Sequence, residues 1–258
     1  MNIVVCVKQI PDPAEPGALS TDTHTLVRTG KIILDDSDRY GVEVGLQLAE
    51  QAGADVVCVS MAPGQEVAGL RSALAMGAAR AILVSDDALG GTDALGTAKV
   101  LAAAIRTVDA DLVIAATEST DGYTGTTPVQ VAELLGMPSI SFAKKVTLDG
   151  STLRADRQTE SGYDEVEVEL PALVTVTAGV VDPRYPSFKG IMSAKSKPLD
   201  ILGVSDLGID PAEVGPTGAR QEILSVEPAE ARSGGEIVVD EGDGYERIVA
   251  FLEELKVV

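Results

Sequence analysis

The stretch Ile3-Val-Val-Cys-Val7 is a continuous apolar run, and similar runs follow it at 56–59, 81–84 and 112–115. None of these runs alternates apolar with polar residues, so both faces of each strand are expected to be buried. The segments between them are amphipathic at helical spacing, and their apolar faces are formed by Val42, Leu46 and Ala49, by Val67, Leu70 and Leu74, and by Leu95, Ala98, Ala102 and Ile105. Gly53 and Gly77 stand where helices should end. The alternation predicts an α/β fold with a doubly wound, mostly parallel sheet and helices on both faces.

The pattern changes in the second half of the chain. Residues 152–157 and 164–177 are expected to be strands, and strict alternation of acids and aliphatics at 165–170 predicts an exposed antiparallel strand. We therefore expect an α/β domain at 1–205 that includes a small antiparallel region. Residues 206–258 hold 13 acids against 4 bases, and only 245–255 is patterned as a helix. We interpret 206–258 as an extended C-terminal arm that lies on a partner, with a loosely ordered tail as the alternative.

Composition excludes several classes of function. The 258 residues carry a net charge of −20, from 40 acidic and 20 basic residues, which argues against binding to nucleic acid or to anionic lipid. Solubility and the steering of a partner explain this charge equally well. Cys6 and Cys58 lie inside apolar runs, as expected for buried thiols in a reducing compartment. With no secretory signal and no apolar run of about 20 residues, we expect a cytoplasmic protein without membrane insertion.

No set of residues in the sequence suggests catalysis. The single histidine, His24, has no Cys or His neighbour with which to bind a metal. The Gly-x-Ser-x-Gly, Gly-x-x-x-x-Gly-Lys-Ser/Thr and Gly-x-Gly-x-x-Gly motifs do not occur. We therefore expect no catalytic residues and no metal site, and we interpret the chain as a carrier or binding protein, not an enzyme.

One segment suggests a ligand: Glu118-Ser-Thr-Asp-Gly-Tyr-Thr-Gly-Thr-Thr-Pro-Val-Gln130, which follows the fourth apolar run and precedes a helix. Open α/β sheets bind ligands at such a place. Thr127 is expected to cap the helix and Pro128 to occupy its first position. The two glycines allow N–H groups to converge and the threonines add hydroxyls, a combination that suits a phosphate. A capped helix after a tight turn would use the same residues, and composition does not decide between the two.

A second segment, 183–200, is basic in an otherwise acidic chain. It carries Arg184, Lys189, Lys195 and Lys197 together with Tyr185, Phe188, Ile191 and Met192. A basic loop with exposed apolar groups predicts docking to an acidic partner. Ile191 and Met192 are expected to turn into the core at a helix start.

Several blocks along the chain resemble one known family. Glu160-Ser-Gly-Tyr-Asp-Glu-Val-Glu-Val-Glu-Leu-Pro-Ala172 and Asp182-Pro-Arg-Tyr-Pro-Ser-Phe-Lys-Gly-Ile-Met-Ser-Ala-Lys-Ser-Lys-Pro198 resemble the signature of electron transfer flavoprotein beta subunits. The blocks at 5–11, 73–78 and 92–98 resemble the family's N-terminal half. The block from Pro183 to Lys197 is the specific one, and the others are weaker alone.

The resemblance implies a heterodimer whose alpha subunit holds most of the FAD. The beta subunit would bind AMP as a structural element, and its arm at 206–258 would contact the alpha subunit. A recognition loop at about 183–198 would dock dehydrogenases, such as the acyl-CoA dehydrogenases of fatty acid beta-oxidation. Electrons would then pass to a membrane quinone oxidoreductase.

The resemblance also implies particular site residues. The nucleotide site would be formed by Cys6, Met61, Asp121, Gly122, Tyr123, Thr124, Gly125 and Thr126, and the docking site by Arg184, Tyr185, Phe188 and Lys189. Three positions depart from the family pattern. Asp35-Asp-Ser37 replaces Asn-Pro-Phe, Tyr123-Thr-Gly-Thr126 replaces Gln-Thr-Gly-Gln, and Phe188 stands where Leu is common.

Alternatives to this interpretation stay open. Within the family, a bifurcating variant would hold a second FAD in place of AMP. A free-standing nucleotide-binding α/β protein would share the first half but would not need the basic loop or the arm. A hydrolytic enzyme on the same sheet would lack a nucleophile and a base.

Overall fold

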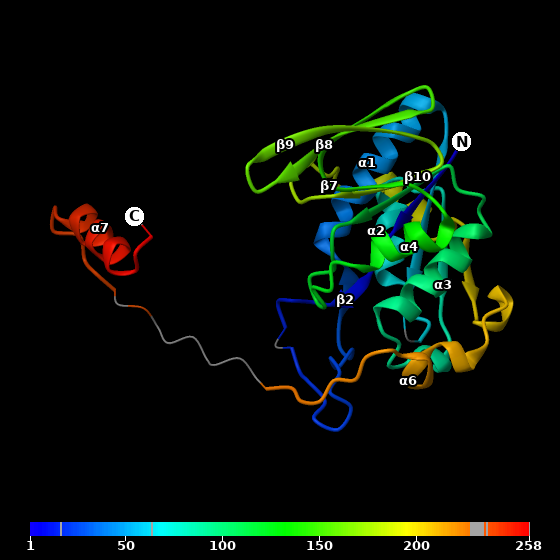
Figure 1. Cartoon of the computed structure of the whole chain (residues 1–258), viewed down its shortest axis with the longest axis horizontal. Helices are drawn as coiled ribbons and strands as arrows, with labels where there is room; N and C mark the ends of the chain where they lie inside the picture. The colour runs from blue at the N-terminus through cyan, green and yellow to red at the C-terminus, as the bar shows by residue number, and fades with distance from the viewer. Residues whose placement is uncertain (16, 63, 228–234, 236, 258) are drawn as a thin grey trace. The chain divides into compact units, whose positions relative to one another are not determined.

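The computed structural model describes residues 1–258 except 16, 63, 228–234, 236 and 258 (Figure 1). Its strands are β1 (Asn2–Cys6), β2 (Gln9–Pro11), β3 (Ile32–Leu34), β4 (Asp55–Met61), β5 (Arg80–Val84), β6 (Leu112–Ala116), β7 (Ser139–Asp149), β8 (Thr152–Thr159), β9 (Gly162–Glu169), β10 (Ala172–Val176) and β11 (Leu199–Leu202). In the described residues nine of them form one sheet, in the order β11-β5-β4-β1-β6-β10-β7-β8-β9. The strands from β11 to β7 are parallel, while β8 and β9 continue the sheet antiparallel.

Five helices lie on the two faces of this sheet (Figure 1), and they are α1 (Asp36–Ala52), α2 (Ala68–Met76), α3 (Ala94–Arg106), α4 (Thr127–Leu135) and α5 (Phe188–Ala194). The described residues also form the helices α6 (Gly215–Gly218) and α7 (Gly244–Glu254) and the 3-10 turns η1 (Asp87–Leu89), η2 (Ser205–Leu207) and η3 (Pro211–Glu213). One apolar cluster packs α1, α2 and α5 against the sheet, and a second packs α3 and α4 against the other face. The predicted doubly wound fold is confirmed.

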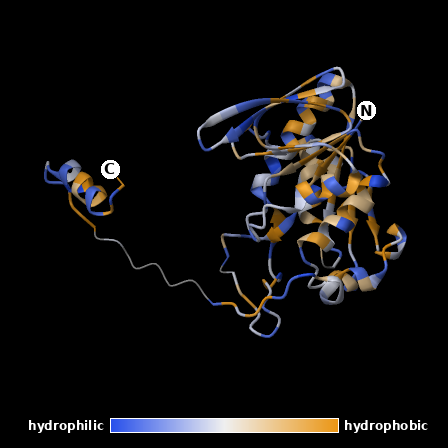
Figure 2. Cartoon of the chain, in the orientation of Figure 1, coloured by the Kyte–Doolittle hydropathy of each residue, from blue (hydrophilic) through white to orange (hydrophobic). Residues whose placement is uncertain are grey.

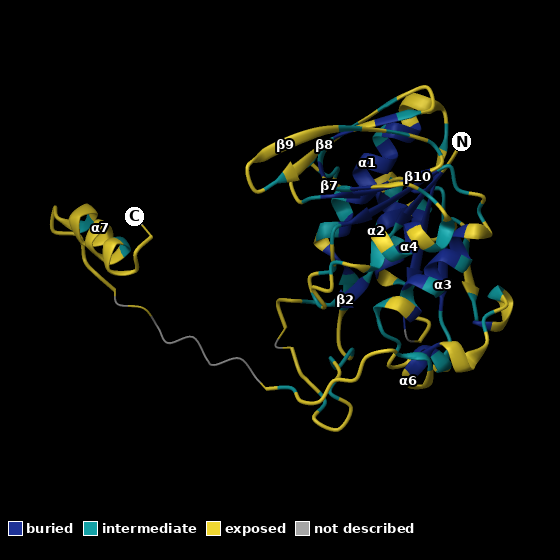
Figure 3. Ribbon diagram, in the orientation of Figure 1, coloured by how far each residue is buried: buried dark blue, intermediate teal, exposed yellow. Residues whose placement is uncertain are grey.

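The central strands are buried on both faces, as their continuous apolar runs predicted. Every residue of β6 and β10 is buried, and so are the five central residues of β4. Figure 3 shows this buried core in the sheet and on the inner sides of the helices, with an exposed surface on β8 and β9. α1 and α2 end at Gly53 and Gly77, as expected.

The antiparallel region contains one correction to the expected strands. The run expected as one strand at 164–177 is two strands with different partners, because β9 pairs with β8 at the edge and β10 lies between β6 and β7. Pro171 separates them, and a residue without an N–H group cannot continue a ladder. The alternation in β9 is confirmed, since Val166 and Val168 face the core while the glutamates between them are exposed. Figure 2 shows this outer hairpin mostly in the colours of hydrophilic residues, whereas the central strands are mostly hydrophobic.

The chain divides into two compact units, residues 1–224 and residues 225–258. This division falls later than the boundary expected after residue 205. Val204 and Val214 are buried in the cluster of α3, so η2, η3 and α6 belong to the first unit. In the second unit, α7 occupies the position of the helix expected at 245–255.

Candidate functional site

The sheet changes its winding direction beside β1. The chain passes from β1 through α1 and α2 to β4 and β5 on one side, and α3 then returns it to β6 on the other side of β1. Open α/β sheets bind ligands outside the carboxyl ends of strands at such a switch point. Lys8 follows β1 there, and the loop 117–126 follows β6. These two segments, with the segment 12–31 and the start of α1, form the candidate site.

The carboxylate of Asp121 joins three parts of this site. Lys8 Nζ donates to its Oδ1 at 2.6 Å and to the Ser119 hydroxyl at 3.1 Å. Arg28 Nη2, from the segment 12–31, donates to its Oδ2 at 2.7 Å. Burial opposes ionisation of Asp121, but the hydrogen bonds and charges of Lys8 and Arg28 outweigh it and hold the pKa of its carboxyl below the ordinary value. One ionised carboxylate therefore holds two cations at the switch point.

Asp35, the residue before α1, is fully buried and accepts hydrogen bonds from four donors. Its Oδ1 accepts from the N–H and hydroxyl of Ser37, at 3.0 and 2.6 Å. Its Oδ2 accepts from the N–H and hydroxyl of Thr120, at 2.7 and 3.1 Å. An ionised carboxylate only accepts, and so it can satisfy all four donors. Asp35 therefore ties the loop after β6 to the first turn of α1.

A second buried acid, Asp38, stands in the first turn of α1. Its Oδ2 accepts from the Lys8 N–H at 2.6 Å. Burial raises the pKa of the Asp38 carboxyl well above its ordinary value, even though this hydrogen bond acts in the opposite direction. Burial, followed by the charge of Asp38, also raises the pKa of the Cys6 and Cys58 thiols to about 12. Both thiols are neutral at physiological pH and pack as apolar groups, as the sequence predicted.

The start of α4 differs from the expected cap. Thr126, not Thr127, is the N-cap residue, and its side chain makes no capping hydrogen bond. Thr127 is the first residue of the helix and Pro128 the second, a position that a proline tolerates because its missing N–H has no partner within the helix. Among the described residues, no hydrogen bond reaches the N–H groups of Thr124, Gly125 or Thr126. The helix therefore begins with free donors beside the switch point.

The loop before α4 is held in an uncommon backbone conformation. Tyr123 has φ 48°, a left-handed conformation that a bulky residue rarely adopts, and its N–H donates to the Ser119 carbonyl at 3.0 Å. Gly125 has φ 68°, where a side chain would be strained. Strain of this kind costs on the order of 1–3 kcal/mol and concentrates at ligand sites.

These features fit an anionic ligand. Free N–H groups at a helix start bind phosphates. The cationic side chains of Lys8 and Arg28 are close by, because both donate to the carboxylate of Asp121.

The structure brings together only part of the predicted nucleotide site. The loop from Asp121 to Thr126 lies at the switch point, and Cys6 and Met61 end the neighbouring strands β1 and β4 at the same edge of the sheet. No hydrogen bond between described residues joins Cys6 or Met61 to that loop. Their contact with a nucleotide stays a prediction.

Sequence reasoning missed Lys8, Arg28 and Asp35. A signal existed for two of them, since Lys8 directly follows a buried strand and Asp35 stands where a helix needs a cap. Arg28 lies in a long polar segment and had no local signal, because only the fold brings it to Asp121.

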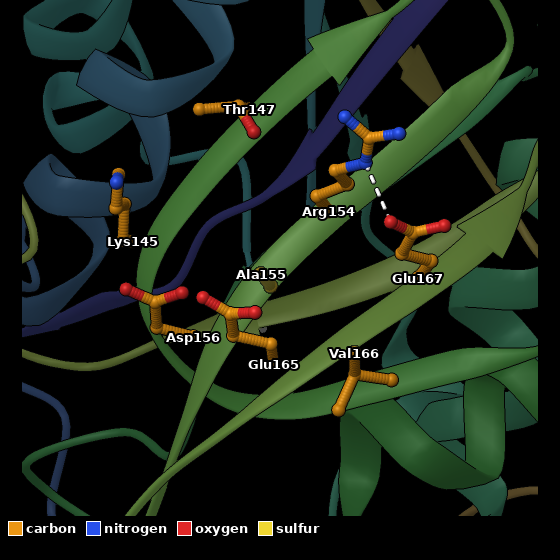
Figure 4. A pocket seen from close by; sticks show the side chains of 8 residues that line it. All are labelled: Lys145, Thr147, Arg154, Ala155, Asp156, Glu165, Val166 and Glu167. Atoms are coloured by element: carbon orange, nitrogen blue, oxygen red, sulfur yellow. Dashed lines mark hydrogen bonds and ion pairs between the residues drawn. The ribbon is translucent and has the colours of Figure 1, made fainter.

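The larger of the two surface hollows described here does not lie at the switch point. A hollow of about 310 Å³ opens on the outer face of β7, β8 and β9, where Arg154 pairs with Glu167 at 2.7 Å and Asp156 stands beside Glu165 (Figure 4). Exposed charged rows of this kind are ordinary on the wet face of a sheet. A smaller cavity of about 50 Å³, lined by Gln9, Arg28, Ile32, Ala62 and Glu66, lies beside the switch point.

The basic loop forms a second candidate site, for docking. Tyr185 and Phe188 are 89% and 81% exposed, and Lys189 is exposed beside them. The expectation that Ile191 and Met192 turn into the core is wrong, since both are exposed on α5. α5 instead packs through its smallest residues, because Ala194 is buried and a Cβ at Gly190 would collide with the carbonyl of Ala75 in α2.

Among the described residues, no group of three or more His, Cys, Asp or Glu side chains is placed to hold a metal ion. Within the same residues, no helix is both long and apolar enough to cross a membrane. His24 Nδ1 lies 2.8 Å from the Ile223 carbonyl, and this hydrogen bond joins two segments that are far apart in the sequence.

The fold and the switch-point site define a doubly wound α/β protein with a loop of free N–H donors between β6 and α4. A family model described as "Electron transfer flavoprotein domain" matches residues 23–207. The chain is 37% identical over 264 residues to the electron transfer flavoprotein subunit beta of Mycobacterium bovis, covering 100% of this chain and 99% of the relative. It is 36% identical over 258 residues to the subunit of the same name in Clostridium acetobutylicum, covering 98% of each. The chain belongs to the family of electron transfer flavoprotein beta subunits.

A further relative carries a different name. The chain is 36% identical over 241 residues to the "Caffeyl-CoA reductase-Etf complex subunit CarD" of Acetobacterium woodii, covering 92% of each.

Replacing Asp35 with asparagine should destabilise the protein and loosen the loop after β6. An amide must turn its NH₂ group toward either the Ser37 pair or the Thr120 pair of donors, and one pair then loses its acceptors. We expect Asp35→Asn to lower the free energy of unfolding in urea by about 1–3 kcal/mol. The matched control is Asp36→Asn, at an exposed neighbour paired with Arg39 at 3.0 Å, where a change under about 1 kcal/mol is expected. Equal losses in the two variants would refute the role of Asp35.

Replacing Asp38 with asparagine should change how stability depends on pH. The pKa of Asp38 is raised by burial in the folded protein, so its contribution to stability is complete below its ordinary pKa of 3.8 and is lost as the pH rises through the folded pKa. The asparagine of the variant would not titrate, yet its side-chain oxygen can still accept from the Lys8 N–H. The stability of Asp38→Asn relative to the unmodified protein should therefore increase between about pH 4 and pH 8 in urea titrations. A difference that stays constant across this range would contradict the assignment.

Proposed function

We propose that this chain is the beta subunit of a heterodimeric electron transfer flavoprotein. The heterodimer would accept electrons from dehydrogenases, such as the acyl-CoA dehydrogenases of fatty acid beta-oxidation, and pass them to the respiratory chain through a membrane quinone oxidoreductase. We place this activity in the cytoplasm. The observation that carries the proposal is the match to the family along the whole chain, supported by the two cations that the switch point holds beside the loop after β6.

The chain would hold AMP as a structural element at the switch point. The N–H groups of Thr124, Gly125 and Thr126 would bind the phosphate, with Lys8 and Arg28 supplying positive charge. The strained loop supports this assignment, because a nucleotide that occupies the site offsets the cost of holding Tyr123 in a left-handed conformation.

The redox chemistry of the complex belongs to FAD, held mainly by the alpha subunit. This chain would contribute binding and orientation, and it would act as a carrier subunit without catalytic residues of its own. A second candidate is a bifurcating subunit that binds FAD in place of AMP. The relative named as a subunit of a caffeyl-CoA reductase–Etf complex supports keeping that alternative.

The exposed loop from Tyr185 to Lys189 would dock the dehydrogenases. Two large aromatic side chains stand free in the solvent there, and aromatic anchors of this kind dominate the energy of many protein interfaces. Lys189 would steer an acidic partner. The side chains of α5 that turn outward enlarge the same apolar patch.

The second unit would bind the alpha subunit through α7. One side of this helix is apolar, and Ile248, Phe251 and Leu255 are all exposed on it. An isolated helix of 11 residues is too short to be stable in water, so an apolar face must be covered for the helix to persist.

Purification with and without an alpha subunit tests the proposed function. The chain expressed alone should be colourless, because the FAD of the complex would be held mainly by the alpha subunit. Co-expression with an alpha subunit should give a yellow complex in equal proportions, measured by absorbance and by size-exclusion chromatography. A stoichiometric flavin spectrum from this chain alone, or no complex with an alpha subunit, would refute the proposal.

A further inference from the structure

Arg184 is bound within the protein although it lies in the exposed loop. Its Nε and Nη2 donate to the two carboxylate oxygens of Glu43 in α1, at 2.7 and 3.0 Å, and its own N–H donates to the same carboxylate at 3.0 Å. Nη1 donates to Glu50, further along α1, at 2.7 Å. Gln47 adds a bond of 2.8 Å to Glu43. The positive charge of Arg184 is therefore neutralised by α1 and is not free for a partner.

Electrostatics agree with this geometry. Glu43 is buried, and burial opposes its ionisation, but the hydrogen bonds and charge of Arg184 outweigh burial and hold the pKa of the Glu43 carboxyl below its ordinary value. The same contacts, those to Glu43 first and to Glu50 second, raise the pKa of the Arg184 guanidinium. Both groups therefore stay ionised across physiological pH.

The other end of the loop is attached to α2. Arg71 Nη1 donates to the carbonyls of Ala194 and Lys197, at 2.6 and 3.0 Å. Lys197 Nζ donates to the carbonyls of Leu74 and Ala78 at the end of α2, at 2.9 and 2.7 Å. The segment between Arg184 and Lys197 is thus held at both ends by side chains that point into the protein.

Tyr185 and Phe188 project from this doubly attached segment. A side chain that is already fixed before binding loses less conformational freedom in the complex, which strengthens binding without adding a contact. We propose that Arg184 is a positioning residue that presents Tyr185 and Phe188 to the partner dehydrogenase, and that it makes no contact with that partner. This inference rests on the docking role proposed above.

Lysine could not replace arginine in this role. The guanidinium matches the two oxygens of Glu43 as a planar fork and still reaches Glu50, whereas an ammonium group is a single point charge. A residue that served only to attract a partner by its charge would tolerate the change. Arg184→Lys therefore separates positioning from direct electrostatic contact.

The test measures reduction of the flavin-loaded heterodimer by a purified acyl-CoA dehydrogenase, with the heterodimer as the varied substrate at low and high salt. Five variants are compared: Arg184→Lys, Glu43→Gln, Glu50→Gln, Lys189→Gln and Phe188→Ala. Flavin content and melting temperature are measured for each, and Glu50→Gln, which removes only the exposed contact of Arg184, is the milder second variant.

We expect Arg184→Lys and Glu43→Gln to raise KM about tenfold, in the direction of Phe188→Ala, with kcat and the salt dependence of KM unchanged. Lys189→Gln should weaken the salt dependence, as the loss of a rim charge does. If Phe188→Ala leaves KM unchanged, the docking function itself is wrong. If Phe188→Ala raises KM but Arg184→Lys and Glu50→Gln both behave as the unmodified heterodimer, the positioning role is wrong. The positioning role is also wrong if Arg184→Lys changes the salt dependence of KM as Lys189→Gln does.

Discussion

The rest of the site depends on the two ion pairs that the carboxylate of Asp121 forms with Lys8 and Arg28. Asp121 follows β6, yet it is held by Lys8 from the end of β1 and by Arg28 from a segment far away in the sequence. Removing that carboxylate would leave two cations without a partner and would free the loop that precedes α4. The reversal of the sheet beside β1 brings these segments together, and the ion cluster then fixes the order in which they lie.

The fold could be predicted from the sequence because continuous apolar runs and helical spacing are local signals. The division of 164–177 into two strands could not, since Val174 is buried as β10 in mid-sheet whereas Val168 lies in an edge strand, and both belong to one apolar-rich run. The loop of the candidate site was predicted as a unit. The groups that hold this loop were not predicted, because their partners lie far away along the chain. Arg28 is the clearest example.

The residues that made the family recognisable are mostly supports for other residues. Arg184 and Lys197 belong to the specific signature block, and both point into the protein and bind helices. The exposed members of the block, Tyr185 and Phe188, stand between them. A family signature can thus contain the residues that position a surface as well as the residues exposed on that surface. At the candidate site Asp35 also supports other residues, although it departs from the family pattern, since its four hydrogen bonds hold the loop in place.

The proposal that the switch point around Asp121 binds AMP is tested most directly by denaturing the purified heterodimer and quantifying the released nucleotides by chromatography, for the unmodified complex and for Asp121→Ala. We expect one FAD and one AMP per unmodified heterodimer, with AMP lost and FAD retained in the variant. Release of two FAD molecules and no AMP, release of one FAD alone, or full retention of AMP by Asp121→Ala would contradict the proposal.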